Sequence, residues 1–204
     1  MRLILTRHGE TLGNIEGVLQ GHGHGQLSVE GTKQALKLGQ RFKEEQLDII
    51  YSSDLKRASD TAREIHKYHS KVPIVFTEKL RERYYGSIEG LRKSQVDPNF
   101  KDNEAFPKEF SYNSENIKKY GMESSESLIK RAKEFIDDIY EKHKDDVVVI
   151  VSHGSFGKAI ISVITGEGYF DIKAQDNTGV SIFDIDKDRN NKIILHNCTK
   201  HLEE

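Results

Sequence analysis

The sequence predicts an α/β fold: a three-layer sandwich in which helices cover both faces of a mostly parallel central sheet. Short apolar segments alternate with longer ones whose apolar residues recur at helical spacing, as expected of strands joined by crossover helices. The segment Val147–Val151 is apolar throughout, which is typical of a parallel strand covered on both faces. With 204 residues the chain is long enough for one domain with a sizeable core, and we expect a single domain over residues 1–204.

Three strands and two helices are expected in the first half of the chain. The strands are the apolar runs Leu3–Leu5, Leu47–Tyr51 and Val72–Phe76. Ser28 is a good N-cap for the first helix, because its hydroxyl can accept a hydrogen bond from a free backbone N–H group. The apolar face of that helix contains Ala35, Leu38, Gly39 and Phe42. Ser52-Ser53-Asp54 supplies capping side chains for the second helix, whose apolar stripe is Leu55, Ala58, Ala62 and Ile65.

The second half continues the alternation and then closes it with two strands. Ser124 or Ser125 can cap a helix whose buried stripe is Leu128, Ala132, Phe135 and Ile139. The strand Val147–Val151 leads through Ser152-His153-Gly154 into a helix that starts near Ser155. Two closing strands are expected at Val180–Ile185 and Ile193–His196, on either side of an Asp-Arg-Asn-Asn turn.

One segment breaks the pattern, from Val96 to Met122. It contains two of the three prolines, many Lys, Asn and Glu residues, and poor periodicity. A stretch of this length without clear structure inside a compact domain is usually a functional lid or a disordered insert. We interpret it as a lid-like insertion at about residues 96–122.

The charge and composition of the chain exclude several classes of binding partner. The net charge of −2 and the pI of about 6.5 provide no basic field of the kind that nucleic acid or anionic membranes attract. Cys198 is the single cysteine, which excludes an internal disulfide. No apolar run reaches membrane-spanning length, and the N-terminus lacks the layout of a signal peptide. We therefore expect a cytoplasmic protein with no nucleic-acid or membrane partner; its oligomeric state is open, with a homodimer as one expectation.

Three cationic or cationisable side chains are expected at one edge of the sheet. His8, preceded by Arg7, follows the first strand; His153 follows Val147–Val151; and Arg57 lies in the first turn of the helix after the second strand. Ligands of such sheets bind beyond the carboxyl ends of the strands. A guanidinium group matches two phosphate oxygens, and a neutral imidazole can hold a phosphoryl group covalently. The pattern therefore predicts a site that takes phosphate from an ester.

The motifs around these residues resemble those of the histidine phosphatase superfamily, the phosphoglycerate mutase-like proteins. The matching blocks occur in the family's order over nearly the whole chain, apart from Val96 to Lys119. They are Thr6-Arg7-His8-Gly9-Glu10-Thr11 with Asn14 and Gln20-Gly21; Ser52-Ser53-Asp54-Leu55-Lys56-Arg57-Ala58 with Thr61-Ala62; Leu80-Arg81-Glu82-Arg83-Tyr84-Tyr85-Gly86 with Glu89-Gly90; Gly121-Met122-Glu123-Ser124 with Arg131; and Val151-Ser152-His153-Gly154.

This resemblance implies a role for each of the matching residues and a small phosphorylated metabolite as substrate. His8 would be the nucleophile that forms a phosphohistidine, and its other ring nitrogen would donate to a backbone carbonyl. Arg7, Arg57 and His153 would clamp the phosphoryl oxygens, and Glu82 would act as general acid and then base. Further contacts to phosphate or substrate are implied for Asn14, Gln20, Gly21, Arg83, Tyr85, Gly154 and Ser155. Gly154 would open a helix whose free N–H groups favour the substrate anion. Neither metal nor cofactor is needed, because the arginines supply positive charge.

The loop after Gln20-Gly21 departs from the family pattern. Relatives often carry an acidic residue and a proline there, whereas this chain has His22-Gly23-His24-Gly25. Alternating histidines can mark a metal site, but no carboxylate follows closely to complete one. We interpret the loop as shaping substrate entry.

Three functions fit the resemblance, and a phosphatase fits best. Gly90-Leu91-Arg92-Lys93 resembles a stretch of the cofactor-dependent phosphoglycerate mutases, in which Lys93 would hold a substrate carboxylate. Those mutases also carry an arginine pair in the insertion, and no arginine occurs here between Arg92 and Arg131. The third block is closer to the fructose-2,6-bisphosphatase-like and broad-specificity phosphatases. A non-catalytic relative that binds phosphorylated ligands would usually lack the nucleophile or the acid, and this chain keeps both.

Overall fold

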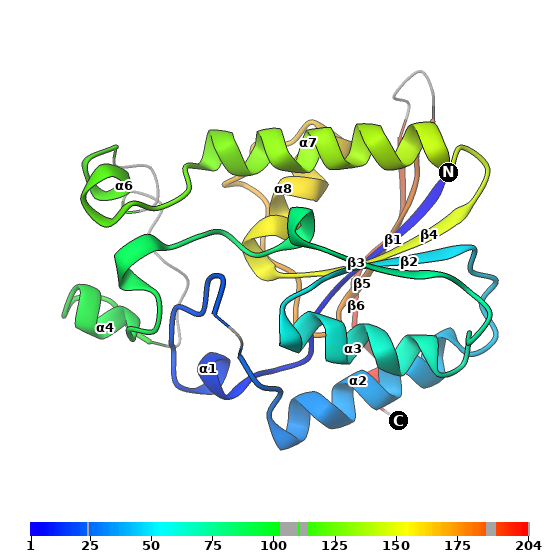
Figure 1. Cartoon of the computed structure of the whole chain (residues 1–204), viewed down its shortest axis with the longest axis horizontal. Helices are drawn as coiled ribbons and strands as arrows, with labels where there is room; N and C mark the ends of the chain where they lie inside the picture. The colour runs from blue at the N-terminus through cyan, green and yellow to red at the C-terminus, as the bar shows by residue number, and fades with distance from the viewer. Residues whose placement is uncertain (24, 103–109, 111–113, 187–190, 204) are drawn as a thin grey trace.

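The computed structural model confirms the predicted three-layer α/β sandwich, with helices on both faces of a six-stranded sheet (Figure 1). The residues described are 1–23, 25–102, 110, 114–186 and 191–203. The strands are β1 (Arg2–Arg7), β2 (Ile49–Ser53), β3 (Ile74–Thr77), β4 (Val147–Ser152), β5 (Val180–Asp184) and β6 (Lys192–Cys198). Their order across the sheet is β3-β2-β4-β1-β5-β6.

The four strands β1 to β4 are parallel, and β5 and β6 complete the sheet in antiparallel pairing. The central strands β1 and β4 are paired in register up to their last residues, Arg7 and Ser152. His8 and His153 therefore leave the sheet side by side, and the His8 N–H donates to the Ser152 carbonyl at 3.0 Å. Strand pairing alone brings together two groups that are far apart in the chain.

Two helices cover each face of the sheet. Helices α2 (Val29–Phe42) and α3 (Lys56–His66) lie on one face, and α7 (Ser125–Lys142) and α8 (Gly154–Thr165) lie on the other (Figure 1). Alternate residues of each strand point to opposite faces, so β1 contributes Leu3 and Leu5 to the core under α7 and α8 and Ile4 to the core under α2 and α3. The shorter helices are α1 (Leu12–Ile15), η1 (Glu78–Leu80), η2 (Gly86–Ile88), α4 (Lys93–Val96), α6 (Ser114–Tyr120) and η3 (Lys200–Leu202).

Two of the three predicted helix caps are confirmed. The Ser28 hydroxyl accepts from the Gly31 N–H at 2.9 Å, and the Ser124 hydroxyl accepts from the Ser127 N–H at 3.1 Å. The cap predicted at Ser52-Ser53-Asp54 is wrong. β2 begins and ends two residues later than expected, so both serines belong to β2 and Leu55 is the N-cap of α3, without a side-chain bond. β3 begins two residues later and ends one residue later than expected. Asp54 instead forms an ion pair with Arg81.

The predicted lid-like insertion contains more regular structure than its composition suggested. Helix α4 ends at Val96, and α6 lies within the segment. Val96, Phe110 and Tyr120 pack against a small core of Leu19, Ile88 and Met122, which joins the insertion to the loop after α1. Residues 103–109 and 111–113 lie outside the described residues, as does most of the turn expected at 188–191. A lid role stays a prediction.

Candidate active site

A pocket of about 600 Å³ opens at the carboxyl ends of the parallel strands. Its lining combines the last residue of β1 and the first turns of α8 with the loops that follow α1, η1 and α8. Among the residues predicted from sequence, those that line it are Arg7, His8, Asn14, Gln20, Gly21, Arg57, Glu82, Arg83, Tyr85, Gly154 and Ser155. His153 is not among the lining residues, but its ring lies edge-on to that of His8, at 5.1 Å between centroids.

The His8 imidazole is held in one tautomer. Its Nδ1 lies 2.7 Å from the Gly9 carbonyl oxygen, and a carbonyl can only accept, so Nδ1 carries the proton and Nε2 keeps its lone pair. Burial, together with the charges of Arg57 and Arg7, holds the pKa of His8 well below its usual value. A neutral ring with a free lone pair at Nε2 is the form that can attack phosphorus.

Contacts to the backbone fix the strand end that carries this ring. The Asn177 side chain donates to the His8 carbonyl at 2.8 Å, and the Gly9 N–H donates to the Thr61 hydroxyl at 3.1 Å. A Cβ on Gly9 would lie 2.4 Å from the Gly31 carbonyl oxygen at the start of α2, so this position cannot carry a side chain without moving the helix. The local backbone therefore has little freedom.

Three cationic or cationisable groups lie near His8: Arg57 and His153 are buried, and Arg7 is partly buried. Arg7 Nη1 donates to the Gln175 carbonyl at 2.9 Å, while Arg57 donates to the carbonyls of Gly21 at 2.8 Å and Gly23 at 2.7 Å. Burial lowers the pKa of Arg57 to about 10, so this group stays charged near neutral pH. Burial and the charge of Arg57 also lower the pKa of His153.

Several buried nitrogens here have no hydrogen-bond partner among the described residues: Nε of Arg7, Nε of Arg57, and both ring nitrogens of His153. A buried donor without a partner costs free energy, so native proteins rarely leave such a cluster unless a ligand satisfies it. The cluster is cationic and encloses His8. It therefore suits the oxygens of a bound phosphoryl group.

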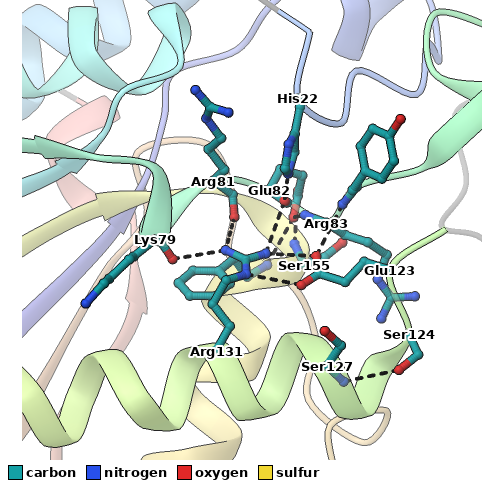
Figure 2. A network of polar contacts seen from close by, with 12 residues as sticks. His22, Lys79, Arg81, Glu82, Arg83, Glu123, Ser124, Ser127, Arg131 and Ser155 are labelled. Atoms are coloured by element: carbon teal, nitrogen blue, oxygen red, sulfur yellow. Dashed lines mark hydrogen bonds and ion pairs between the residues drawn. The ribbon is translucent and has the colours of Figure 1, made fainter.

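The Glu82 carboxylate lies at the N-terminus of α8, where it accepts three backbone N–H groups (Figure 2). Oε1 accepts from Arg83 at 2.8 Å and Phe156 at 3.0 Å, and Oε2 accepts from Ser155 at 3.1 Å. This differs in part from the expectation that the free N–H groups of this helix would meet the substrate anion, because Glu82 occupies those of Ser155 and Phe156. A Cβ on Gly154 would lie 3.7 Å from both Glu82 Oε2 and the Arg7 guanidinium, so both groups lie close to Gly154.

The other residues predicted from sequence also line the pocket. Arg83 is buried and donates from Nη2 to the hydroxyls of Ser125 at 2.9 Å and Tyr169 at 3.3 Å. The Tyr85 hydroxyl lies 3.2 Å from the Ser155 hydroxyl, and burial raises the pKa of Tyr85. Asn14 lies in α1, and Gln20 and Gly21 lie in the loop that follows it.

Sequence reasoning missed the residues that hold the site from the segment between α8 and β5. Gln175 is buried and donates to the Leu5 and Gly179 carbonyls, which positions its own carbonyl for Arg7. This segment has no periodicity or motif that marks it. Lys158 and Lys173 also line the pocket and were missed, although Lys158 lies three residues after Ser155 on α8 and could have been placed by helical spacing.

No cluster that could hold a metal ion occurs among the described residues, and His24 lies outside them. The His22 ring is directed to the carbonyl of Glu82, with Nε2 2.9 Å from the oxygen. Within the described ranges, no helix is both long enough and apolar enough to cross a bilayer.

The fold and the site define a phosphoryl-transfer enzyme with a buried histidine. The family model of the histidine phosphatase superfamily (branch 1) matches residues 3–199, and the chain belongs to this family. It is 37% identical over 164 residues to a metal-independent phosphoserine phosphatase of Arabidopsis thaliana, covering 80% of this chain and 68% of the relative. It is 30% identical over 211 residues to a broad-specificity phosphatase of Saccharomyces cerevisiae, covering 99% and 87%.

Solved structures share the architecture. A phosphoserine phosphatase mutant from Entamoeba histolytica, in complex with phosphoserine, has a TM-score of 0.80 and 27% identity, with 98% of each chain covered. The chain is thus a phosphomonoester hydrolase of the phosphoglycerate mutase-like fold, which acts on small phosphorylated substrates through a phosphohistidine intermediate.

Proposed function

We propose that His8 is the residue that carries the phosphoryl group. The observation that supports this most directly is the 2.7 Å contact from His8 Nδ1 to the Gly9 carbonyl, which leaves the lone pair on Nε2. The lowered pKa keeps the ring unprotonated at neutral pH. Arg7, Arg57 and His153 bind the phosphoryl oxygens, because each has a buried nitrogen without a partner among the described residues. The charges of the two arginines meet the charge of the transition state.

Glu82 moves the proton in both half-reactions. In the first, the bond from His8 Nε2 to phosphorus forms as the phosphorus–ester oxygen bond breaks, and Glu82 gives its proton to the leaving oxygen. In the second, a water oxygen bonds to phosphorus as the nitrogen–phosphorus bond breaks, and the water's proton passes to Glu82. The backbone N–H groups of Arg83, Ser155 and Phe156 hold this carboxylate beside the Arg7 side of the pocket.

The substrate is a small phosphate ester that also carries a carboxylate, with phosphoserine as the first candidate. Besides the residues already described, the pocket is lined by three lysines and one aspartate: Lys93, Lys158, Lys173 and Asp102. This excess of positive charge favours a second anionic group on the substrate. The relatives named as phosphoserine phosphatases support the same substrate class.

A mutase is the second candidate, and Lys93 is the observation that favours it. Lys93 lines the pocket, and its Nζ donates to the Asp102 carbonyl at 2.8 Å. A cytoplasmic location, a homodimeric assembly and the absence of membrane partners stay predictions. The net charge of −2 supports the further prediction that nucleic acid is not a partner.

The deciding experiment has two readouts. Incubation with a labelled phosphate donor should give an acid-labile, base-stable phosphoenzyme, and His8→Ala should lose it. Phosphoserine, 3-phosphoglycerate and fructose 2,6-bisphosphate should then be assayed for free phosphate against isomerised product. Label that persists in His8→Ala would refute the nucleophile, and efficient isomerisation lost in Lys93→Ala would establish the mutase.

A further inference from the structure

The His22 ring binds the main chain of the proposed proton-transfer residue. Its Nε2 lies 2.9 Å from the Glu82 carbonyl oxygen (Figure 2). Since a carbonyl accepts only, Nε2 carries a proton and donates it in this bond. The ring also lies against Tyr84, at 5.2 Å between centroids. The family signature provides no role for this side chain, and the metal interpretation does not account for it.

A second contact joins the same loop to the same segment. One oxygen of the Glu89 carboxylate accepts from the backbone N–H of His22 at 2.9 Å and from that of Tyr85 at 3.0 Å. Gly21 has a positive φ of 46°, and a Cβ there would lie 1.7 Å from this oxygen. The close approach is therefore built into the backbone, and it brings the His22 ring to Glu82.

The loop is anchored at its other side by a phosphate-clamp residue. Arg57 donates to the carbonyls of Gly21 and Gly23, the two residues that flank His22. The three-residue stretch from Gly21 to Gly23 therefore connects Arg57 with the segment that carries Glu82. A shift of either partner is transmitted through a few short hydrogen bonds.

The Glu82 carbonyl has one other donor among the described residues, Arg131 on α7 (Figure 2). Its Nη2 lies 3.3 Å from the oxygen, and its Nη1 donates to the carbonyls of Arg81 at 2.8 Å and Lys79 at 3.0 Å. Glu123 holds the guanidinium in place. His22 makes the shorter of the two bonds to Glu82, so its loss would leave the longer one alone.

We propose that His22 is a positioning residue for this reaction: through its Nε2–H bond to the Glu82 carbonyl, it sets the distance between the Glu82 carboxylate and the phosphoryl site. The inference rests on the proposed function of Glu82. It predicts a specific defect, since a carboxylate displaced by about 1 Å costs on the order of 10²-fold in the proton-dependent step. Attack by His8 on an ester with a good leaving group needs no proton and should be spared.

The test compares His22→Leu with His22→Gln. Leucine removes the donor, whereas the glutamine amide N–H can reach the position of Nε2. We expect His22→Leu to lower kcat on phosphoserine roughly 10- to 100-fold with a smaller change in KM. The burst of p-nitrophenolate from p-nitrophenyl phosphate, which reports phosphoenzyme formation, should stay within about threefold, and His22→Gln should recover most of kcat on phosphoserine.

His66→Leu is a matched control. His66 also places Nε2 near a carbonyl oxygen, that of Val72 at 3.0 Å, but it lies at the end of α3 and does not line the pocket. Its activity on both substrates should equal that of the wild type. His22→Asn, whose amide is too short to reach, provides a second donor-free variant if the leucine variant does not fold.

Three results would overturn the positioning role. Equal losses in His22→Leu and His22→Gln would mean that ring packing on Tyr84 matters and the donor does not. An equal loss in burst and turnover would place His22 in phosphate binding. His8→Ala and Glu82→Gln, assayed in parallel, test the proposed function separately. If they behave as expected while His22→Leu resembles the wild type, the positioning role alone is wrong.

Discussion

The two sides of the pocket are built in different ways. The side that holds His8 and His153 consists of the ends of β1 and β4, two paired central strands buried on both faces. The side that holds Glu82 is a stretch between short 3₁₀ helices, and side chains from distant elements hold its carbonyls: Arg131 from α7 and His22 from the loop after α1. Sheet pairing positions the proposed nucleophile. The main chain of the proposed proton donor is instead held by a few side-chain bonds, and its carboxylate by three backbone N–H groups. We therefore expect the Glu82 side to be the more easily displaced by single substitutions.

The largest effect is expected on the strand-end side. His8→Ala should abolish turnover, with a loss of up to about 10⁶-fold, because removal of a covalent nucleophile disables both half-reactions. Steady-state release of phosphate from phosphoserine measures the loss. His69→Ala serves as a control, since this ring contacts the Phe42 carbonyl far from the pocket. Substantial residual turnover would show that His8 is not the nucleophile.

The next largest loss of activity is expected on the side that holds Glu82, and its size should depend on the leaving group of the ester. Glu82→Gln should cut hydrolysis of phosphoserine by about 10²–10⁴-fold, because a strongly basic alkoxide needs a proton to leave. The p-nitrophenolate burst should persist, since that leaving group departs almost unaided. Glu78→Gln, at an exposed carboxylate outside the pocket, should leave both unchanged. An equal loss on both esters would assign the proton to another group.

A smaller effect is expected on the pH dependence of stability, and it comes from the two histidines on the strand-end side. The pKa values of His8 and His153 are lowered in the folded protein, whereas in the unfolded chain both titrate near 6.5. Below about pH 6.5 the unfolded chain therefore binds more protons, and the free energy of unfolding should fall as pH falls. Each ring contributes about 1.4 kcal/mol per pH unit below that value.

Denaturant unfolding at pH 7.5 and 5.5 measures this dependence. In His153→Leu, the loss of stability between the two pH values should be smaller than in the wild type by roughly the contribution of one ring. An unchanged difference would mean that the ring gains its proton without leaving the native structure.

The smallest effect should leave the pocket untouched. Ser28→Ala removes the hydroxyl that caps α2 and should lower the free energy of unfolding by about 1 kcal/mol. Activity on phosphoserine should not change, because Ser28 does not line the pocket. Ser70→Ala, at an exposed position, should change neither the free energy of unfolding nor the activity on phosphoserine. A change in kcat for Ser28→Ala would mean that α2 transmits small shifts to His8 through Gly9.

The sequence by itself determined those features whose causes are local. An apolar run predicted β4 as a buried parallel strand, and hydroxyl side chains before apolar stripes predicted the caps at Ser28 and Ser124. The Arg7-His8 pair at a strand end predicted the edge of the sheet at which the pocket opens. The same reasoning misplaced the α3 cap, because Ser52 and Ser53 can pair in a strand as readily as they can cap a helix.

Only the tertiary structure decided which groups meet across the pocket. That Glu82 occupies the N-terminus of α8, that Gln175 and Asn177 hold Arg7 and His8, and that His22 binds the Glu82 carbonyl all depend on contacts between residues far apart in the chain. No periodicity or motif encodes such contacts, because they arise from the packing of separate elements. Backbone carbonyls accept most of them, and every residue carries a carbonyl, so the amino-acid sequence does not distinguish which one is used.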